Sequence, residues 1–238
     1  MTTVPVRPRN DPAQYDDLAA SWWDSRGRFA MLHWIAQARS RLVPPAERSG
    51  SLLLDLACGA GLLAPHVAAL GHRHVGVDLS ATALGQARDH GVTAVRGDVL
   101  RLPFADEVAD VVVAGEVLEH VTDLPGAVAE ACRVLRPGGT LVIDTIAATW
   151  FGRFSSITVG ERVPAGPPPG LHDPALYVDR ADLVRLALLG GVTLTLSGLR
   201  PSGPGYVAWL LGRRQDVRMI RSRSTAGLFQ AYGTKEQR

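Results

Sequence analysis

The sequence predicts an α/β fold in which a doubly wound, mostly parallel sheet of seven strands carries helices on both faces. From about residue 51 to residue 145, short runs of Val, Leu and Ile alternate with helical patterns. The runs are apolar throughout, as strands buried on both faces require. Strand–helix–strand order gives right-handed crossovers and therefore a parallel sheet.

Most elements of this fold can be located in chain order. The predicted strands cover residues 51–56, 75–78, 92–96, 109–114, 140–145 and 192–199. The predicted helices cover residues 15–43, 62–70, 81–90, 125–135 and 179–190. The remainder of the C-terminal stretch shows no clear pattern.

The chain divides into a polar lead and one large domain. Residues 1–14 are polar and contain prolines, so we expect a disordered lead. Residues 15–45 form a predicted helical lid that ends at Pro44 and Pro45. Residues 46–238 form the main domain, in which residues 148–172 interrupt the alternation and are expected to be an insertion over the active site.

Composition narrows the class of protein. The chain has 238 residues, is 46% hydrophobic and 20% charged, and carries a net charge of +2, which does not favour nucleic acid as a partner. No apolar signal core or membrane-length apolar stretch is present, so a cytoplasmic location is expected. Cys58 and Cys132 suggest neither a disulfide framework nor a thiolate metal site.

A glycine-rich turn follows the first predicted strand. Gly59 and Gly61 allow a ligand to approach the backbone, and Asp78, at the end of the next strand, suits the hydroxyls of a ribose. This is a Rossmann-like nucleoside-binding unit. The turn alone also fits a dinucleotide, so an NAD-dependent oxidoreductase is one alternative.

Acidic residues at three strand ends favour a cationic ligand instead. Asp55 precedes the glycine turn, where the pyrophosphate of a dinucleotide would be repelled, and Asp98 with Val99 follows the third strand. S-adenosylmethionine (SAM) combines a sulfonium and an ammonium group with a ribose diol and an adenine amino group. The other interpretation is that the acids only cap helices.

Several motifs resemble known methyltransferases. Residues 50–147 resemble the class I SAM-dependent methyltransferases; the matching pieces are Asp55–Gly61, Gly76–Asp78, Gly97–Asp98 with Leu102–Phe104, Val117–Val121 and Leu135–Gly139. Trp22–Asp24, Glu116–His120 and Leu171–Asp173 resemble motifs of the ubiquinone-biosynthesis O-methyltransferases. Those enzymes methylate a hydroxyl of a polyprenylated, catechol-type ring. The resemblance implies SAM contacts at Arg39, Ala57, Asp78 and Gly115.

The strand-end residues and the family resemblance together give one set of candidates for cofactor binding. They are Arg39, Asp55, Ala57, Gly59, Gly61, Asp78, Asp98, Val99 and Gly115.

A second motif predicts a cation site beside the methyl donor. Glu116, Glu119 and His120 have the spacing that places three side chains on one face of a helical turn. With His172 they would form a two-Glu, two-His site for a divalent cation, Mg²⁺ preferred and Mn²⁺ or Zn²⁺ possible. The set also resembles the metal site of small-RNA 3′-terminal 2′-O-methyltransferases. Glu119 and His120 are the catalytic candidates; the alternative is that they make structural hydrogen bonds, with His120 at most a general base.

We therefore expect a SAM-dependent O-methyltransferase of a small catechol-like aromatic acceptor, such as a prenylated quinone precursor. Alternatives are methylation of a soluble natural product or an amine, and a non-catalytic SAM-binding protein. In the resembled family the insertion meets the membrane. Residues 149–163 could contact the inner face of a membrane in this way, or simply cover the pocket. Trp22, Trp23 and Phe29 form either a lid or a buried stripe. The sequence does not indicate the oligomeric state.

Overall fold

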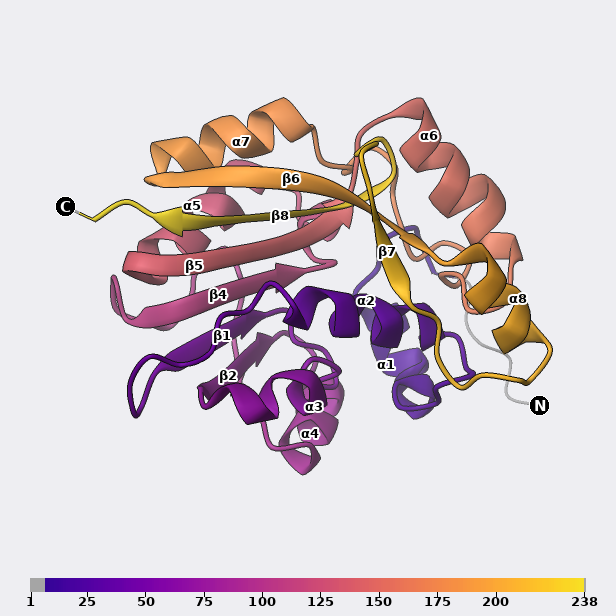
Figure 1. The fold of residues 1–238 in the computed structure, drawn as a ribbon, viewed down its shortest axis with the longest axis horizontal. Coiled ribbons are helices and arrows are strands. Elements are labelled where there is room, and N and C mark those ends of the chain that lie inside the picture. Colours follow the sequence, from indigo (N-terminus) through magenta and orange to yellow (C-terminus); the bar gives the residue numbers. More distant parts are fainter. Residues whose placement is uncertain (1–6, 238) are drawn as a thin grey trace.

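A computed structural model describes residues 7–237, which form one mixed sheet with helices on both faces (Figure 1). The strands are β1 (Leu52–Leu56), β2 (Arg73–Asp78), β3 (Thr93–Arg96), β4 (Ala109–Gly115), β5 (Leu135–Ile146), β6 (Val192–Pro201), β7 (Met219–Ser222) and β8 (Leu228–Lys235). They lie in the order β3-β2-β1-β4-β5-β8-β6-β7. The α/β class is confirmed, but the sheet has eight strands instead of the predicted seven.

The sheet is parallel on one side and antiparallel on the other. β3, β2, β1, β4 and β5 pair in parallel, whereas β8 pairs antiparallel with both β5 and β6, and β7 with β6. β1 therefore lies between β2 and β4, which is the point where the winding of the chain reverses. In open α/β sheets the carboxyl ends of the strands at such a point form the ligand crevice.

The helices cover both faces of the sheet. They are α1 (Ala13–Asp17), α2 (Ala30–Ser40), α3 (Ala64–Val67), α4 (Ala81–Asp89), α5 (Leu124–Val134), α6 (Trp150–Arg153), α7 (Arg180–Leu189) and α8 (Gly203–Leu210). On one face, residues of α5 and α7 pack with Leu54 and Val112 of the central strands. On the other, Leu63 and Val67 pack with Leu53 and Val113. Alternate residues of β1 and β4 thus feed two cores, which explains their continuous apolar runs.

The N-terminal region differs from the predicted lead and single helix. Residues 1–6 lie outside the described residues, but residues 7–14 make contacts with the rest of the chain, and α1 begins at Ala13. The helical pattern predicted over 15–43 is divided into α1, a 3₁₀ turn (Ala19–Ser21) and α2. Between them, Gly27 approaches the Asp24 side chain too closely for another residue to fit easily, and this turn breaks the helix.

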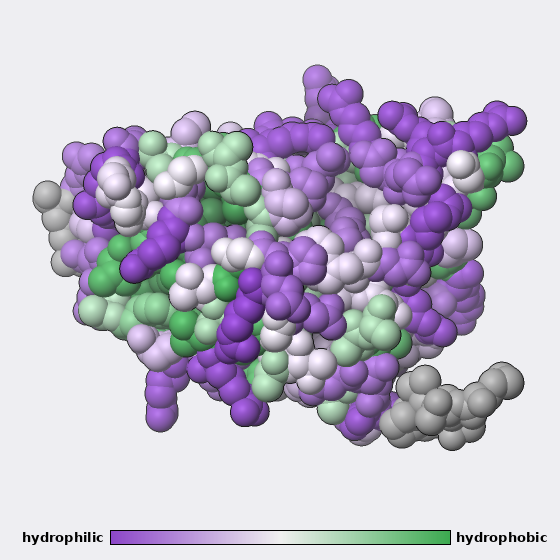
Figure 2. All heavy atoms as spheres, turned by 90° about the horizontal axis from the view of Figure 1, so that it is seen from below, coloured by the Kyte–Doolittle hydropathy of each residue, from purple (hydrophilic) through white to green (hydrophobic). Residues whose placement is uncertain are grey.

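The insertion is helical and folds over the carboxyl ends of the strands. It contains α6, a π-helical turn (Phe154–Val159) and a 3₁₀ turn (Gly160–Arg162). Among the described residues, no helix combines the length and apolarity needed to cross a bilayer. On the face that carries α3 and α4, hydrophobic side chains form small patches separated by polar ones (Figure 2).

Candidate active site

A pocket of about 1080 Å³ opens at the carboxyl ends of β1, β2 and β4. Its walls come from segments far apart in the chain: the N-terminal region, the glycine turn, the insertion, and the segment from β6 to β8. Nearly all the predicted cofactor residues line it, namely Arg39, Asp55, Ala57, Gly59, Asp78, Asp98, Val99 and Gly115. Gly61 is the exception. Its missing side chain instead leaves room for Ala87 of α4 and for Val92, so it allows close helix packing.

The glycine turn is shaped by backbone conformation and by an aromatic side chain. Gly59 has a φ of +53°, and a Cβ added there would lie 2.7 Å from Cη2 of Trp22. Trp22 is buried and stacks on Phe29 with ring centroids 4.4 Å apart. Both rings line the pocket, whereas Trp23 stacks on His90, the residue that follows α4. The N-terminal helical region therefore contacts the glycine turn directly through Trp22.

The three predicted acids have different partners. Asp78 accepts hydrogen bonds from the backbone N–H groups of Gly59 (2.9 Å) and Ser80 (2.8 Å), which joins the ends of β1 and β2. Burial raises the pKa of Asp78 above its usual value, and these bonds oppose that shift. Asp55 lies 3.2 Å from Nε2 of His74, a partner that the sequence did not indicate. Asp98 accepts from the backbone N–H of Leu100.

Arg39 is held by a buried carboxylate. Its Nε and Nη2 atoms each donate to Asp144, at 2.6 Å, and both side chains are buried. A Cβ at position 115 would overlap the Arg39 guanidinium, so Gly115 is required for the arginine to lie across the end of β4. Nη1 takes no part in the Asp144 pair. The geometry leaves this nitrogen available for the carboxylate of an amino-acid ligand.

Glu119, His120 and His172 form a second group of polar side chains. Each offers one potential metal-ligand atom, and these atoms lie within 4.8 Å of one another. Glu119 is fully buried and its Oε2 accepts from the hydroxyl of Thr145 at 2.7 Å. Within the described part of the chain, its Oε1 and Nδ1 of His172 have no hydrogen-bond partner. Buried polar groups without a partner are available to bond to a water, an ion or a ligand.

Burial sets the ionisation of this group. It raises the pKa of Glu119 to about 7 and lowers the pKa of His172 to about 4. The pKa of His120 is also lowered well below its usual value, by burial first and then by His172. Both imidazoles are therefore neutral at neutral pH, which is the form that binds cations or accepts protons.

Glu116 does not join this group. The prediction of one helical face for Glu116, Glu119 and His120 was wrong, because only Leu118–His120 form a 3₁₀ turn and Glu116 precedes it with a φ of 53°. Glu116 lies instead beside Asp144 and Arg39, and burial followed by the charges of Glu119 and Asp144 raises its pKa. The structure thus brings together three of the four predicted metal ligands.

Four other residues of the site were not predicted from the sequence. Tyr15 places its hydroxyl 3.1 Å from Nε2 of His120, and Asn10 places its Oδ1 2.5 Å from Nδ1 of the same ring. Asp144 and Thr145 lie in an apolar strand, where their types could have marked them as unusual. Asn10 lies in the stretch expected to be disordered, so nothing in the sequence pointed to it.

Comparison with known proteins places this geometry in a family. Residues 54–143 match the model of a methyltransferase domain. The chain is 32% identical to the ubiquinone biosynthesis O-methyltransferase of Rhodopseudomonas palustris (strain BisB5), covering 94% of this chain and 97% of that protein. It is 34% identical to the enzyme of the same name from Thiobacillus denitrificans, covering 79% and 84% of the two chains.

The chain belongs to the ubiquinone biosynthesis O-methyltransferase family. It is therefore a SAM-dependent O-methyltransferase, which confirms the predicted enzyme class and methyl donor and replaces the nicotinamide alternative. Among solved structures, a SAM-dependent methyltransferase from Thermotoga maritima, described as a possible histamine N-methyltransferase, has a TM-score of 0.64 at 19% identity. That likeness covers 94% of this chain and 97% of the other, and supports the fold alone.

Proposed function

We propose that this enzyme methylates a hydroxyl of a catechol-like aromatic ring that carries an apolar substituent. The observation that carries the proposal is the group Glu119, His120 and His172, whose potential ligand atoms lie within 4.8 Å of one another. His120 and His172 line the same pocket as the cofactor residues. An oxygen nucleophile needs a group of this kind to lose its proton, because a phenol with a pKa of about 10 is almost fully protonated at neutral pH.

The cofactor part of the pocket fits SAM in charge and shape. Asp78 has the position that suits a ribose diol, Asp98 that of an adenine amino group, and Asp55 is an anion beside the expected cationic end. Arg39 would bind the carboxylate of the amino-acid part through Nη1. When bound, SAM supplies an electrophilic methyl group on a sulfonium.

A divalent cation is part of the proposal. Glu119, His120 and His172 would hold it, and the unpartnered Glu119 Oε1 and His172 Nδ1 fit such a ligand. Because Glu116 lies apart, two imidazoles and one carboxylate remain, and this set moves the preference from Mg²⁺ towards Mn²⁺ or Zn²⁺. The cation would supply Lewis acidity that lowers the pKa of a bound hydroxyl.

The protein side of the reaction follows from these positions. His120, which lines the pocket, would bind the acceptor hydroxyl and take up its proton, and the buried Glu119 beside it would help to hold the cation. The acceptor oxygen then bonds to the methyl carbon, while the carbon–sulfur electron pair returns to sulfur. Trp22 and Phe29 cover the cofactor turn and exclude water, and fixed orientation supplies much of the acceleration.

The remaining lining of the pocket supports a bulky apolar acceptor. It is supplied by α2, the insertion and the segment from β6 to β8, through Met31, Ile35, Val159, Val163, Leu199 and Leu228. The names of the relatives point to a ubiquinone precursor as one acceptor of this description.

We also propose that the protein is cytoplasmic and that residues 149–163 contact the inner face of the membrane. Trp150 is 75% exposed, and Phe151, Phe154 and Val159 of the same segment are also exposed. Trp150 and Phe154 stack on each other, with ring centroids 5.2 Å apart, and present one aromatic surface.

Flotation with phosphatidylglycerol-containing vesicles tests this membrane contact: W150A/F154A should float less than wild type. The matched control is Leu189→Ala on α7, an equally exposed apolar residue. Equal flotation of all three proteins would contradict the proposal.

A substrate panel tests the acceptor class. We would incubate the purified enzyme and SAM with one acceptor at a time: a catechol, a monophenol or an aromatic amine. The products are then identified by mass spectrometry. A methyl ether from the catechol, with little product from the other two, supports the proposal. Exclusive methylation of the amine, or of a polar compound without an aromatic diol, would overturn it.

A further inference from the structure

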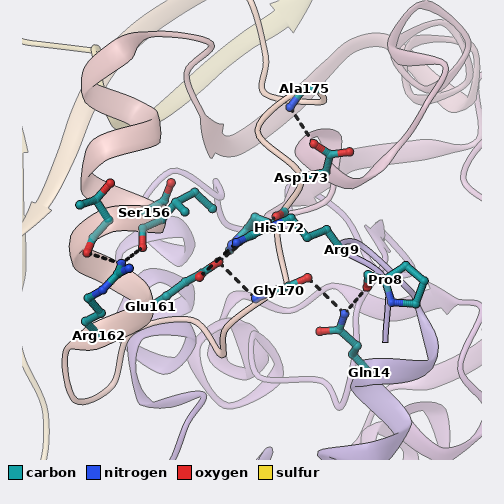
Figure 3. A network of polar contacts seen from close by, with 12 residues as sticks. Pro8, Arg9, Gln14, Ser156, Glu161, Arg162, Gly170, His172, Asp173 and Ala175 are labelled. Atoms are coloured by element: carbon teal, nitrogen blue, oxygen red, sulfur yellow. Dashed lines mark hydrogen bonds and ion pairs between the residues drawn. The ribbon is translucent and has the colours of Figure 1, made fainter. Parts of the chain in front are cut away.

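The segment Arg9–Tyr15 links the two histidines of the site. Arg9 donates to the backbone carbonyl of His172 (2.9 Å) and to Glu161 (2.8 Å), while Gln14 donates to the carbonyl of Gly170 (3.1 Å). Figure 3 shows these bonds converging on the loop that carries His172. The same segment reaches His120 through Asn10 and Tyr15. The N-terminal segment is thus bonded to both sides of the acceptor site.

Asn10 makes two hydrogen bonds to one residue, and together they fix the direction of its amide. Its Nδ2 donates to the backbone carbonyl of His120 at 2.9 Å, and its Oδ1 faces the ring nitrogen Nδ1 of His120 at 2.5 Å. A backbone carbonyl can only accept, so the amide nitrogen must face it. The amide oxygen then faces the ring, and since it too can only accept, Nδ1 must carry a hydrogen.

A hydrogen on Nδ1 leaves one lone pair on the neutral ring, at Nε2. The hydroxyl of Tyr15 lies 3.1 Å from this nitrogen and can donate to it. Tyr15 lines the pocket, so its phenol has the position and chemistry of an acceptor hydroxyl. His120 can act on a substrate or a cation only through Nε2, and the phenol of Tyr15 must move when that occurs.

We propose that Asn10 is a positioning residue that holds His120 in the Nδ1–H tautomer, so that Nε2 is its working atom. This deepens the proposed function and rests on it for the role of His120, although the tautomer itself does not depend on any substrate. Tyr15 occupies Nε2 until an acceptor displaces it. The N-terminal segment is therefore part of the acceptor site.

The tautomer can be observed directly by long-range ¹H–¹⁵N correlation NMR on the full-length protein, with His120→Gln used to assign the ring. We expect protonated Nδ1 and a lone pair on Nε2 in the wild type. Asn10→Gly suits the backbone, since Asn10 has a φ of 60°, and removes both bonds. It should give a mixture of tautomers. Asn10→Asp keeps an acceptor for Nδ1–H and should restore the wild-type tautomer.

Gln14→Ala is the matched control, because Gln14 also makes two bonds to backbone carbonyls from this segment but none to His120. It should leave the ring nitrogen shifts unchanged. A lone pair on Nδ1 in the wild type, or the same spectrum in Asn10→Gly and wild type, would overturn the inference. A changed spectrum in Gln14→Ala would also overturn it, because the effect would then come from the segment and not from Asn10.

Kinetics separate this inference from the proposed function. Asn10→Gly should lower kcat by about tenfold to a hundredfold with the KM for SAM unchanged, and Asn10→Asp should recover most of the loss. If wild-type enzyme methylates no catechol, the proposed function fails while the spectra still test the tautomer. If the catechol is methylated but Asn10→Gly retains full kcat, the positioning role of Asn10 fails alone.

Discussion

The two halves of the pocket differ in how the groups proposed to bind their ligands are paired. In the cofactor half, Asp78 is bonded to two backbone N–H groups and Arg39 to both oxygens of Asp144. In the acceptor half, among the described residues, one oxygen of Glu119 and one ring nitrogen of His172 have no partner. In the cofactor half the same is true of Nε1 of Trp22 and Oε1 of Glu116, but not of Asp78 or Arg39, the groups proposed to bind SAM. Arg39 and Asp144 on one side and Glu119 and His172 on the other are all buried, so the difference between these pairs does not come from solvent.

This contrast teaches which half is ready for its ligand. A buried polar group without a partner costs about 1–3 kcal/mol, whereas a paired one costs little. Asp78 and Arg39 are already held in place, so these two groups lose little on binding. The acceptor half carries a cost that a cation or a substrate hydroxyl would relieve. Each of the following predictions changes one half of the pocket.

The largest expected effect is on turnover. Glu119→Gln removes the carboxylate of the acceptor half and should lower kcat by about a hundredfold or more. The affinity for SAM, measured by calorimetry, should stay within about twofold, because Glu119 does not line the cofactor pocket. Glu47→Gln, at an exposed carboxylate, is the control. Full activity of Glu119→Gln would show that the acceptor half lies elsewhere.

The second prediction affects the cofactor half. Asp78→Asn replaces one acceptor oxygen by a donor facing the N–H of Gly59 or Ser80, so the turn is disturbed. The affinity for SAM should fall by about tenfold to a hundredfold. Asp89→Asn, at an exposed acid on α4, serves for comparison. If Asp78→Asn bound SAM as tightly as the wild type, Asp78 would not contribute to SAM binding.

The third prediction concerns stability and pH in the presence of EDTA. Burial raises the pKa of Glu119 to about 7 in the folded protein, above the 4.5 of a free side chain, so the folded state binds the proton more tightly. The contribution to stability is complete below pH about 4.5 and is lost as pH rises through about 7. The melting temperature of wild type should therefore fall across this range by a few degrees more than that of Glu119→Gln. Parallel curves for the two proteins would contradict this.

The smallest effect is expected at Ala57, which has a φ of 52° in the cofactor turn. This conformation costs an alanine about 1–2 kcal/mol, but glycine loses more entropy on folding, so the net gain is about 1 kcal/mol or less. Ala57→Gly should raise the melting temperature by about 2 °C without weakening SAM binding. A lower melting temperature would mean that the methyl group of Ala57 makes a stabilising contact.

The sequence predicted those features of the fold and site that depend on residues close together in the chain. The glycine turn, Asp78 and the apolar runs that form β1, β2 and β4 depend on neighbours in the sequence, so their patterns predict them. The bond between Arg39 and Asp144 joins residues far apart in the chain, and no local pattern contains it. β7, a four-residue edge strand, and β8, which lies antiparallel between β5 and β6, were not predicted because their sequences have little apolar pattern of their own.

The acceptor half was harder still to predict, because its residues come from several distant segments of the chain. His172 was found only by resemblance, and Glu116 was misplaced because spacing was converted into a helix where the backbone has a positive φ. Asn10 and Tyr15 belong to a stretch whose composition predicts a disordered lead continuing into a helix, yet tertiary contacts order it. A site assembled from several segments cannot be derived from the pattern of any one of them.

The most direct test of the account is methyl transfer from SAM to a catechol by EDTA-treated enzyme, before and after Mg²⁺, Mn²⁺ or Zn²⁺ is added. The account predicts that SAM still binds the treated protein, that methyl ether formation falls at least tenfold, and that one of the three cations restores it. Full turnover in EDTA, with no cation bound to the purified protein, would contradict the assignment of Glu119, His120 and His172 as a cation site.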